Sequence, residues 1–190
     1  MIYRIYVERL SGFETEAECL YYDLKENLLI SGLKSVRFIN RYDTEKIDID
    51  IFEKAKNTVF SEPQTSFVSD NIELVDGDIM FAVEYLPGQY DQRADSCAQC
   101  IQILTCGERP NIRTARIYIL NGEISDDKLD KIKKYIINPV ESREAALDIP
   151  ETLTDNFETP APIETIDGFT ELTDDMISDF IESYALAMDI

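Results

Sequence analysis

The sequence has no histidine and only 7 glycines among its 190 residues. Lack of histidine excludes the most common general base and a frequent zinc ligand. It contains no Gly-x-Gly-x-x-Gly pattern and no glycine-rich loop before a lysine, which excludes the usual phosphate-binding loops. Paired carboxylates could still act as acid and base, but among 38 acidic residues their spacing carries no information. We therefore expect residues outside these 190 to complete whatever chemistry the chain serves.

Long apolar runs are also missing. No stretch approaches the 18 or so consecutive apolar residues that a membrane helix requires. The amino terminus alternates apolar Ile2, Ile5 and Val7 with Arg4 and Glu8, where a signal peptide would have a basic start and an apolar run. These features predict a cytoplasmic protein that does not enter a membrane.

Positive charge is scarce and unevenly placed in a chain with a net charge of -20. All 18 Lys and Arg residues lie at or before Arg143, whereas 13 of the 38 acidic residues follow it. This balance argues against binding to nucleic acid or to anionic membranes, since both require a cationic surface. The acidic carboxyl-terminal part is either a solvated linker or a strap that lies on a basic partner surface.

Cysteine is limited to four residues, Cys19, Cys97, Cys100 and Cys106. A structural zinc site uses four thiolate or imidazole ligands in two clusters, so the single Cys97-x-x-Cys100 pair lacks its second half. Free structural thiols are the favoured interpretation, and a redox pair is the alternative.

The main positive feature is a tandem repeat. The pattern Val-Glu-x-Leu-x-Gly begins at Val7 and again at Val83, and Pro63 and Pro139 lie 76 residues apart. The sequence therefore predicts two copies, residues 1–75 and 76–147, that close on each other like the subunits of a dimer.

Each copy has the pattern strand, helix, strand, helix. Thr15-x-x-Glu18 is expected to form a capping box, Asp50-x-x-Glu53 to begin the next helix, and Ser125 to cap the last one. Expected strands cover residues 3–8, 36–40, 79–84 and 115–120, with an extended piece near residue 67. This order predicts an α+β fold of duplicated ferredoxin-like units, with antiparallel sheets and all helices on one side.

Residues 148–190 differ in composition from the repeats. Pro150, Pro160 and Pro162 interrupt a polar, acidic stretch that we expect to be a linker lying over another surface. A helix is predicted from Thr173, with an apolar stripe that needs a partner and comprises Met176, Ile177, Phe180, Ile181, Tyr184 and Met188. We interpret this helix as truncated, and we expect the sequence to be part of a longer protein.

Two polar clusters are candidate sites. In the first, residues 85–96, Gly88 allows close backbone approach, the helix start offers free N–H groups and Arg93 adds a cation, so an anion or a partner loop could bind. The second runs from Asn138 to Arg143 and could contact the rest of a parent protein. The alternatives are an ordinary strand-to-helix turn and a helix stop.

Four phrases in these regions resemble one family. They are Ala82-Val83-Glu84-Tyr85-Leu86-Pro87-Gly88-Gln89-Tyr90-Asp91-Gln92-Arg93-Ala94-Asp95-Ser96, Asn138 to Glu144, Thr58-Val59-Phe60-Ser61-Glu62-Pro63-Gln64 and Tyr184-Ala185-Leu186-Ala187-Met188-Asp189. In this order they are similar to the amino-terminal region of the large single-chain phosphoribosylformylglycinamidine synthase, the PurL type. Its amino-terminal domain resembles two fused copies of the small PurS subunit, and a helical linker domain follows.

The resemblance implies a non-catalytic scaffold in an ATP- and glutamine-dependent ligase of purine biosynthesis. ATP and Mg²⁺ belong to the parent enzyme, with no cofactor in this part, and the partners are the synthetase and glutaminase domains of the same chain. Gly88, Gln89 and Arg93 are the residues expected to reach the synthetase site, with Asn138 and Arg143 as further contacts. Cys97 departs from the family pattern, in which alanine is expected, and this departure concerns packing alone.

Two other interpretations stay open. A stand-alone regulator would bind a small effector at the seam between the copies. A purely structural module would instead dimerise, whereas a fused pair that already has its partner stays monomeric in light scattering.

Overall fold

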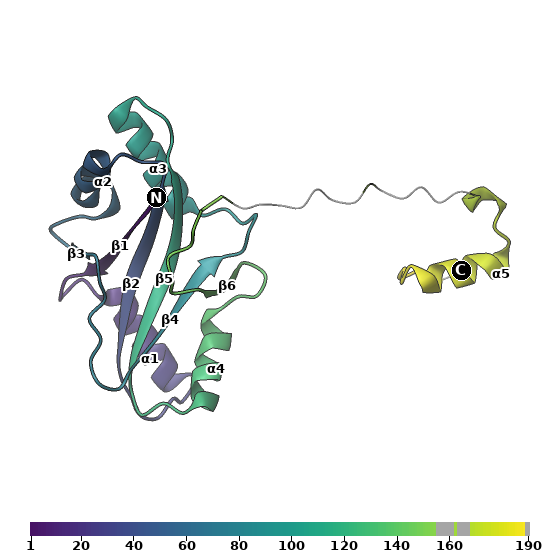
Figure 1. Cartoon of the computed structure of the whole chain (residues 1–190). Coiled ribbons are helices and arrows are strands. Elements are labelled where there is room, and N and C mark those ends of the chain that lie inside the picture. Colours follow the sequence, from purple (N-terminus) through teal and green to yellow (C-terminus); the bar gives the residue numbers. More distant parts are fainter. Residues whose placement is uncertain (155–161, 163–167, 189–190) are drawn as a thin grey trace. The chain divides into compact units, whose positions relative to one another are not determined.

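The computed structural model describes residues 1–154, 162 and 168–188 (Figure 1). The chain divides into a first compact unit, Met1–Asp155, and a second, Asn156–Ile190. In the described residues no helix combines the length and the apolar character needed to cross a membrane.

The first unit contains the two copies, and each runs strand, helix, strand, helix, strand. The first comprises β1 (Ile2–Arg9), α1 (Thr15–Glu26), β2 (Leu33–Glu45), α2 (Ile49–Ala55) with a π-helical turn (Lys56–Phe60), and β3 (Ser66–Ser69). The second comprises β4 (Asp78–Tyr85), α3 (Gln92–Thr105), β5 (Asn111–Gly122), α4 (Asp126–Ile136) and β6 (Ser142–Ala145). The short closing strand β6 was not predicted, and β2 and β5 are longer than expected.

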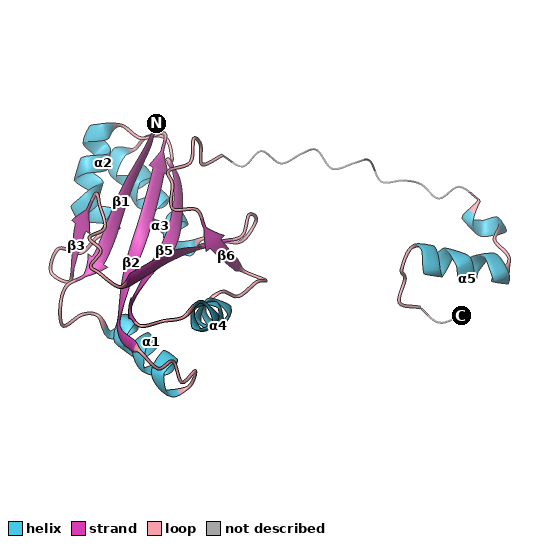
Figure 2. Cartoon of the chain, turned by 60° about the horizontal axis from the view of Figure 1, so that its bottom comes forward, coloured by secondary structure: helices cyan, strands magenta, loops and turns pink. Residues whose placement is uncertain are grey.

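The six described strands of this unit form one antiparallel sheet in the order β3-β1-β2-β5-β4-β6 (Figures 1 and 2). If β1, β2 and β3 are exchanged with β4, β5 and β6, the strand order is the same when it is read from the opposite edge. The long strands β2 and β5 meet in the middle, with Ile39 opposite Ile117. The α+β fold with helices on one side is therefore confirmed, and the copies share a single continuous sheet.

The helix-bearing face holds two apolar cores, and each core mixes the two copies. In the larger core, Leu24 of α1 and Ile132 of α4 are fully buried against Phe81 of β4 and Leu120 of β5. Each such buried side chain stabilises the fold by about 1.5–3 kcal/mol. The other core joins α2 and α3 over β1 and β2, through residues Ile5, Val7, Tyr42, Phe52, Ala55, Phe60, Cys97 and Ile101. Neither copy could bury these faces alone.

The opposite face carries a third apolar group and a covering strap. The group consists of Ile39, Ala82, Ala115, Ile117, Ile119 and Ala145. Residues 146–154, which we call the strap, are fixed to this face by arginine side chains. Arg41 Nη1 donates to the Ala146 carbonyl at 2.7 Å, and Arg113 Nη2 donates to the Leu153 carbonyl at 3.2 Å. The segment expected to be a linker thus begins as a strap bonded to the sheet.

Local capping differs from the sequence pattern at two helices. Thr15 is already helical, and the preceding Glu14 makes no side-chain cap but accepts a hydrogen bond from Gly12 N at 3.1 Å, so the predicted capping box was wrong. At α2 the cap is Asp48, whose side chain accepts from Asp50 N. Helix starts shift by a residue or two because neighbouring carboxylates compete for the same free N–H groups.

The second unit contains a short 3₁₀ turn (Phe169–Glu171) and α5 (Asp174–Ser183), which begins where it was predicted, with Thr173 at the N-cap position. The helix ends at Ser183, so Tyr184 and Met188 of the predicted stripe lie beyond it. The ring of Phe180 packs against Phe169 and Tyr184, with centroids 5.3 and 4.5 Å apart. Within residues 168–188 no side chain is buried.

Candidate functional site

Two turns that are far apart in the sequence meet at one end of the sheet. Leu86 N, in the β4–α3 turn, donates to the Glu141 carbonyl at 2.9 Å, in the turn that precedes β6. Gln89 Nε2 donates to the Val140 carbonyl at 3.3 Å. The pairing of β4 with β6 brings these turns together, since it places Arg143 opposite Glu84. The two candidate clusters therefore form one surface, which we call the turn pair.

Gly88 is required by the conformation of its turn. Its φ of +88° lies in the left-handed region, and a Cβ added there would meet nothing within 4 Å. Gln89 N donates to the Leu86 carbonyl at 3.0 Å and closes the turn. The positive φ therefore accounts for the glycine at this position. The space above the turn is open.

The start of α3 already holds a carboxylate. Asp91 Oδ1 accepts from Ala94 N at 2.9 Å, while Oδ2 accepts from both Thr114 N at 3.0 Å and Thr114 Oγ1 at 2.8 Å. This cap satisfies a free helix N–H group and ties the helix to β5. An anion binding here would have to share the helix terminus with the Asp91 charge.

Arg93 is the second residue of α3 and lies in its first turn, on the helix-bearing side of the sheet. Among the described residues its one hydrogen bond runs from Nη1 to the Tyr42 hydroxyl at 3.5 Å. Burial acts to lower the pKa of Arg93, but Tyr42 and the charge of Glu16 raise it overall, so the side chain stays cationic. Two hollows border it, one of about 490 Å³ and one of about 260 Å³. Asn40, whose buried Oδ1 has no hydrogen-bond partner within residues 1–154, 162 and 168–188, borders the smaller one.

Asn138 and Arg143 shape the second turn. Asn138 Oδ1 accepts from Val140 N at 3.1 Å, and its backbone carbonyl accepts from Ser142 N at 2.8 Å. Arg143 Nε donates to Glu84 Oε1 at 2.9 Å across the β4–β6 pair. The Asn138 amide therefore organises the turn, whereas Arg143 is a half-exposed cation with a fixed partner.

The predicted site residues fall into two groups. Gly88, Gln89 and Arg143 border a hollow of about 460 Å³, whereas Arg93 and Asn138 border the 490 Å³ hollow. The first hollow also contains an ion pair of Arg109 with Asp95 that the sequence analysis missed. No local spacing signals this pair, because it joins a helix to the loop that follows it.

The cysteines form no metal centre. Among the described residues, no group of three or more His, Cys, Asp or Glu side chains could hold a metal ion. All four cysteines are free, and burial raises the pKa of the Cys97 thiol to about 12. Cys97 therefore behaves as a small apolar side chain of the α2–α3 core.

Comparison with protein-family models and with curated proteins found no match for this chain. What bears on function is thus the geometry of the turn pair together with the four phrases of the sequence.

Proposed function

We propose that this chain is a non-catalytic scaffold, the amino-terminal region of a cytoplasmic single-chain phosphoribosylformylglycinamidine synthase. One observation carries the proposal. Two of the phrases that resemble that family are separated by about 40 residues, yet they form one hydrogen-bonded surface through Leu86, Gln89 and Val140. If two segments form one docking surface, we expect both of them to contain residues that resemble the family.

The turn pair has the character of a protein contact surface. Tyr90 and Val140 are exposed to 68% and 72%, and Tyr85 to 45%. Exposed aromatic side chains next to fixed charges are typical of surfaces that bind another protein domain. The partners in this proposal are the synthetase and glutaminase domains of the same parent chain, where ATP and Mg²⁺ act.

The chemistry explains the need for such a scaffold. Glutamine hydrolysis releases ammonia, which in neutral water becomes ammonium and loses its nucleophilic lone pair. A body that holds the two catalytic domains together keeps ammonia in an enclosed passage. The single sheet shared by both copies makes this body rigid, since β2 and β5 pair along their whole lengths.

The test uses Arg93→Ala in the parent enzyme, with Arg9→Ala as the matched control. Arg9 borders the same 260 Å³ hollow but is half-exposed, donating to Thr65 Oγ1 at 2.6 Å and lying 3.7 Å from Glu62. We expect Arg93→Ala to reduce glutamine-dependent synthesis at least about tenfold, with a smaller effect on synthesis from added ammonium and little change in Tm. Equal rates for both variants and wild type would refute the assigned role of Arg93.

A second candidate function is a stand-alone ligand-binding module. The two hollows on either side of Arg93 favour it, because one is bordered by β1 and β2 and the other by β4 and β5. This alternative predicts saturable binding of a small effector to residues 1–190 alone. The reading frame beyond Ile190 distinguishes the two: continuation into synthetase and glutaminase domains supports the scaffold, and a stop codon supports the regulator.

A further inference from the structure

A small hollow on the helix-free face is bordered by a buried arginine. Its volume is about 210 Å³, and its border consists of Tyr6, Arg41, Asn71, Ile72, Met80, Ile117 and Leu147. Most of this border is apolar. Its polar bordering residues are Arg41, Tyr6 and Asn71. The hollow lies on the face opposite the helices and shares no bordering residue with those at the turn pair.

Arg41 is poorly satisfied for a buried cation. Its side chain is 3% exposed, and the guanidinium has five N–H groups. One of them donates to the Ala146 carbonyl at 2.7 Å. The Nε atom lies 3.2 Å from Asp43 Oδ2 but is not aligned with it, and it has no hydrogen-bond partner in the part of the chain that the structure describes. Glu84 is 3.8 Å from Nη2, too far for a hydrogen bond.

The neighbouring carboxylates are already engaged by other arginines. Asp43 accepts from Arg4 through both oxygens, at 2.5 and 2.9 Å, and Glu84 accepts from Arg143 at 2.9 Å. Three guanidinium groups thus share two carboxylates. Burial, the largest influence, lowers the pKa of Arg41 despite the charges of Asp43 and Glu84. An additional anion next to Arg41 would complete the charge balance.

We propose that this hollow binds a short-chain monocarboxylate. The carboxylate accepts hydrogen bonds from Arg41, and the alkyl chain packs against Ile72, Met80 and Ile117. The volume is below the range of about 300–1,000 Å³ that is typical for drug-sized ligands, so the ligand has only a few heavy atoms. A guanidinium matches a planar carboxylate better than a spherical anion because it offers two parallel N–H groups. This site does not depend on the proposed scaffold function.

The experiment titrates butanoate into residues 1–190 with labelled Ile and Met methyl groups, followed by NMR at constant ionic strength. We expect saturable shifts of the Met80, Ile72 and Ile117 methyls in the millimolar range. The Ile132 methyl, in the core on the other face, is the internal control and should not move. Butan-1-ol and chloride at equal concentration test whether the carboxylate itself is recognised.

Two variants make the test decisive. Met80→Phe fills the hollow and retains Arg41, so it should weaken binding at least about tenfold. Arg41→Lys keeps the charge but loses the planar pair of donors and should weaken binding by a smaller factor. The site is refuted if the shifts are linear in butanoate, if butan-1-ol reproduces them, or if Met80→Phe leaves them unchanged. A folded spectrum of Met80→Phe without butanoate ensures that lost binding is not lost structure.

Discussion

Arg4 of β1 and Asp43 of β2 lie directly opposite each other in the strand register and form a two-pronged ion pair, Nε to Oδ1 at 2.5 Å and Nη2 to Oδ2 at 2.9 Å. Their side chains are 5% and 1% exposed. The same Arg4 guanidinium donates to the strap carbonyls of Leu147 and Asp148. The pair therefore fixes both the strand register and the strap on the helix-free face.

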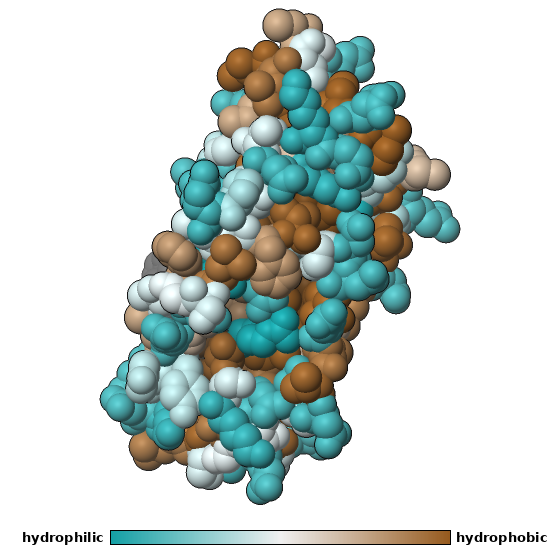
Figure 3. All heavy atoms as spheres, turned by 90° about the vertical axis from the view of Figure 1, so that its left-hand side faces the viewer, coloured by the Kyte–Doolittle hydropathy of each residue, from teal (hydrophilic) through white to brown (hydrophobic). Residues whose placement is uncertain are grey.

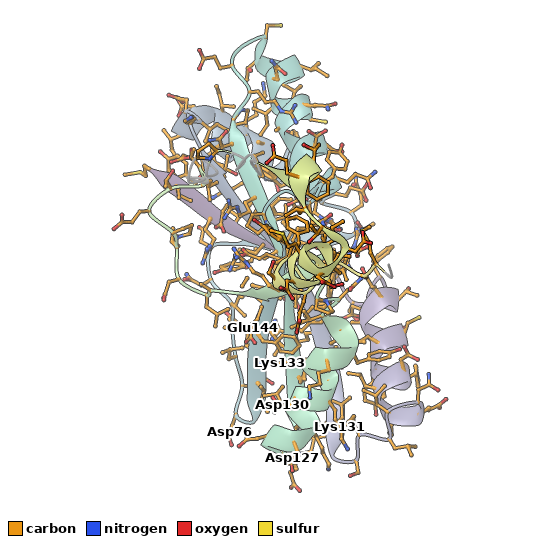
Figure 4. All side chains as sticks on the ribbon, turned by 90° about the vertical axis from the view of Figure 1, so that its right-hand side faces the viewer. Asp76, Asp127, Asp130, Lys131, Lys133 and Glu144 are labelled. Carbon is orange, nitrogen blue, oxygen red and sulfur yellow. The ribbon has the colours of Figure 1, made fainter. Side chains whose placement is uncertain are left out.

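Replacing Asp43 with Asn should destabilise the protein strongly. The change leaves Arg4 and Arg41 buried with one nearby carboxylate fewer, and breaking a buried pair costs about 3–5 kcal/mol. Urea unfolding measures this free energy. The matched control is Asp130→Asn on the exposed side of α4, where Figure 4 labels Asp130 near Lys133, and it should change stability by less than about 0.5 kcal/mol. Similar values for both variants would contradict the role given to the buried pair.

Gly122 and Gly88 should respond differently to alanine. A Cβ at Gly122 would lie 2.1 Å from the Gly32 carbonyl oxygen, and φ is +144°. Gly88 has φ +88° but free space around it. We expect Gly88→Ala to cost about 1–2 kcal/mol from backbone strain alone, and Gly122→Ala to cost roughly 3 kcal/mol or more because the backbone of the β2–β5 pair must move. Thermal unfolding of both variants checks the order, and a less stable Gly88→Ala would invert it.

Cys97 should be unreactive in the folded protein and should make it sensitive to alkali. Its pKa of about 12 means that the folded thiol stays protonated while the unfolded thiol ionises from roughly pH 8.5 upward. The unfolded state then binds fewer protons, so stability falls between these values by up to about 1.4 kcal/mol per pH unit. At pH 8, maleimide should label Cys19, Cys100 and Cys106 well before Cys97.

The control for this prediction is Cys97→Ala, which should reduce the decline in stability above pH 9 while leaving labelling of the other cysteines unchanged. Rapid labelling of Cys97 under native conditions would contradict its placement in the α2–α3 core.

Residue patterns alone could not locate the turn pair, and the distribution of apolar residues on the surface of the first unit is one reason. Apolar residues occur there in several separate groups among polar ones, as Figure 3 shows for one face. Gly88 and Pro139 mark turns from sequence alone because their backbone preferences are local. That these two turns touch follows from β6, a four-residue edge strand whose pairing with β4 has no local signal.

The duplication could be predicted from the sequence because the same residue pattern recurs at a fixed interval. It correctly predicted the α+β fold. The sequence did not predict that helices of different copies pack together, α1 beside α4 and α3 beside α2. This packing depends on which apolar faces meet after the sheet forms. The arginine network on the helix-free face was missed for the same reason. Arg41 and Asp43 lie two residues apart and share one face of β2. Only the register of β1 with β2 brings Arg4 opposite Asp43.

Most directly, the scaffold account is tested by reconstitution in two pieces. A parent enzyme that lacks residues 1–190 is produced separately, and glutamine-dependent formation of formylglycinamidine ribonucleotide is measured with and without added residues 1–190. The account predicts that the shortened enzyme is nearly inactive and that the added piece restores activity saturably, less so when it carries Arg93→Ala. Full activity of the shortened enzyme without the added piece would contradict it.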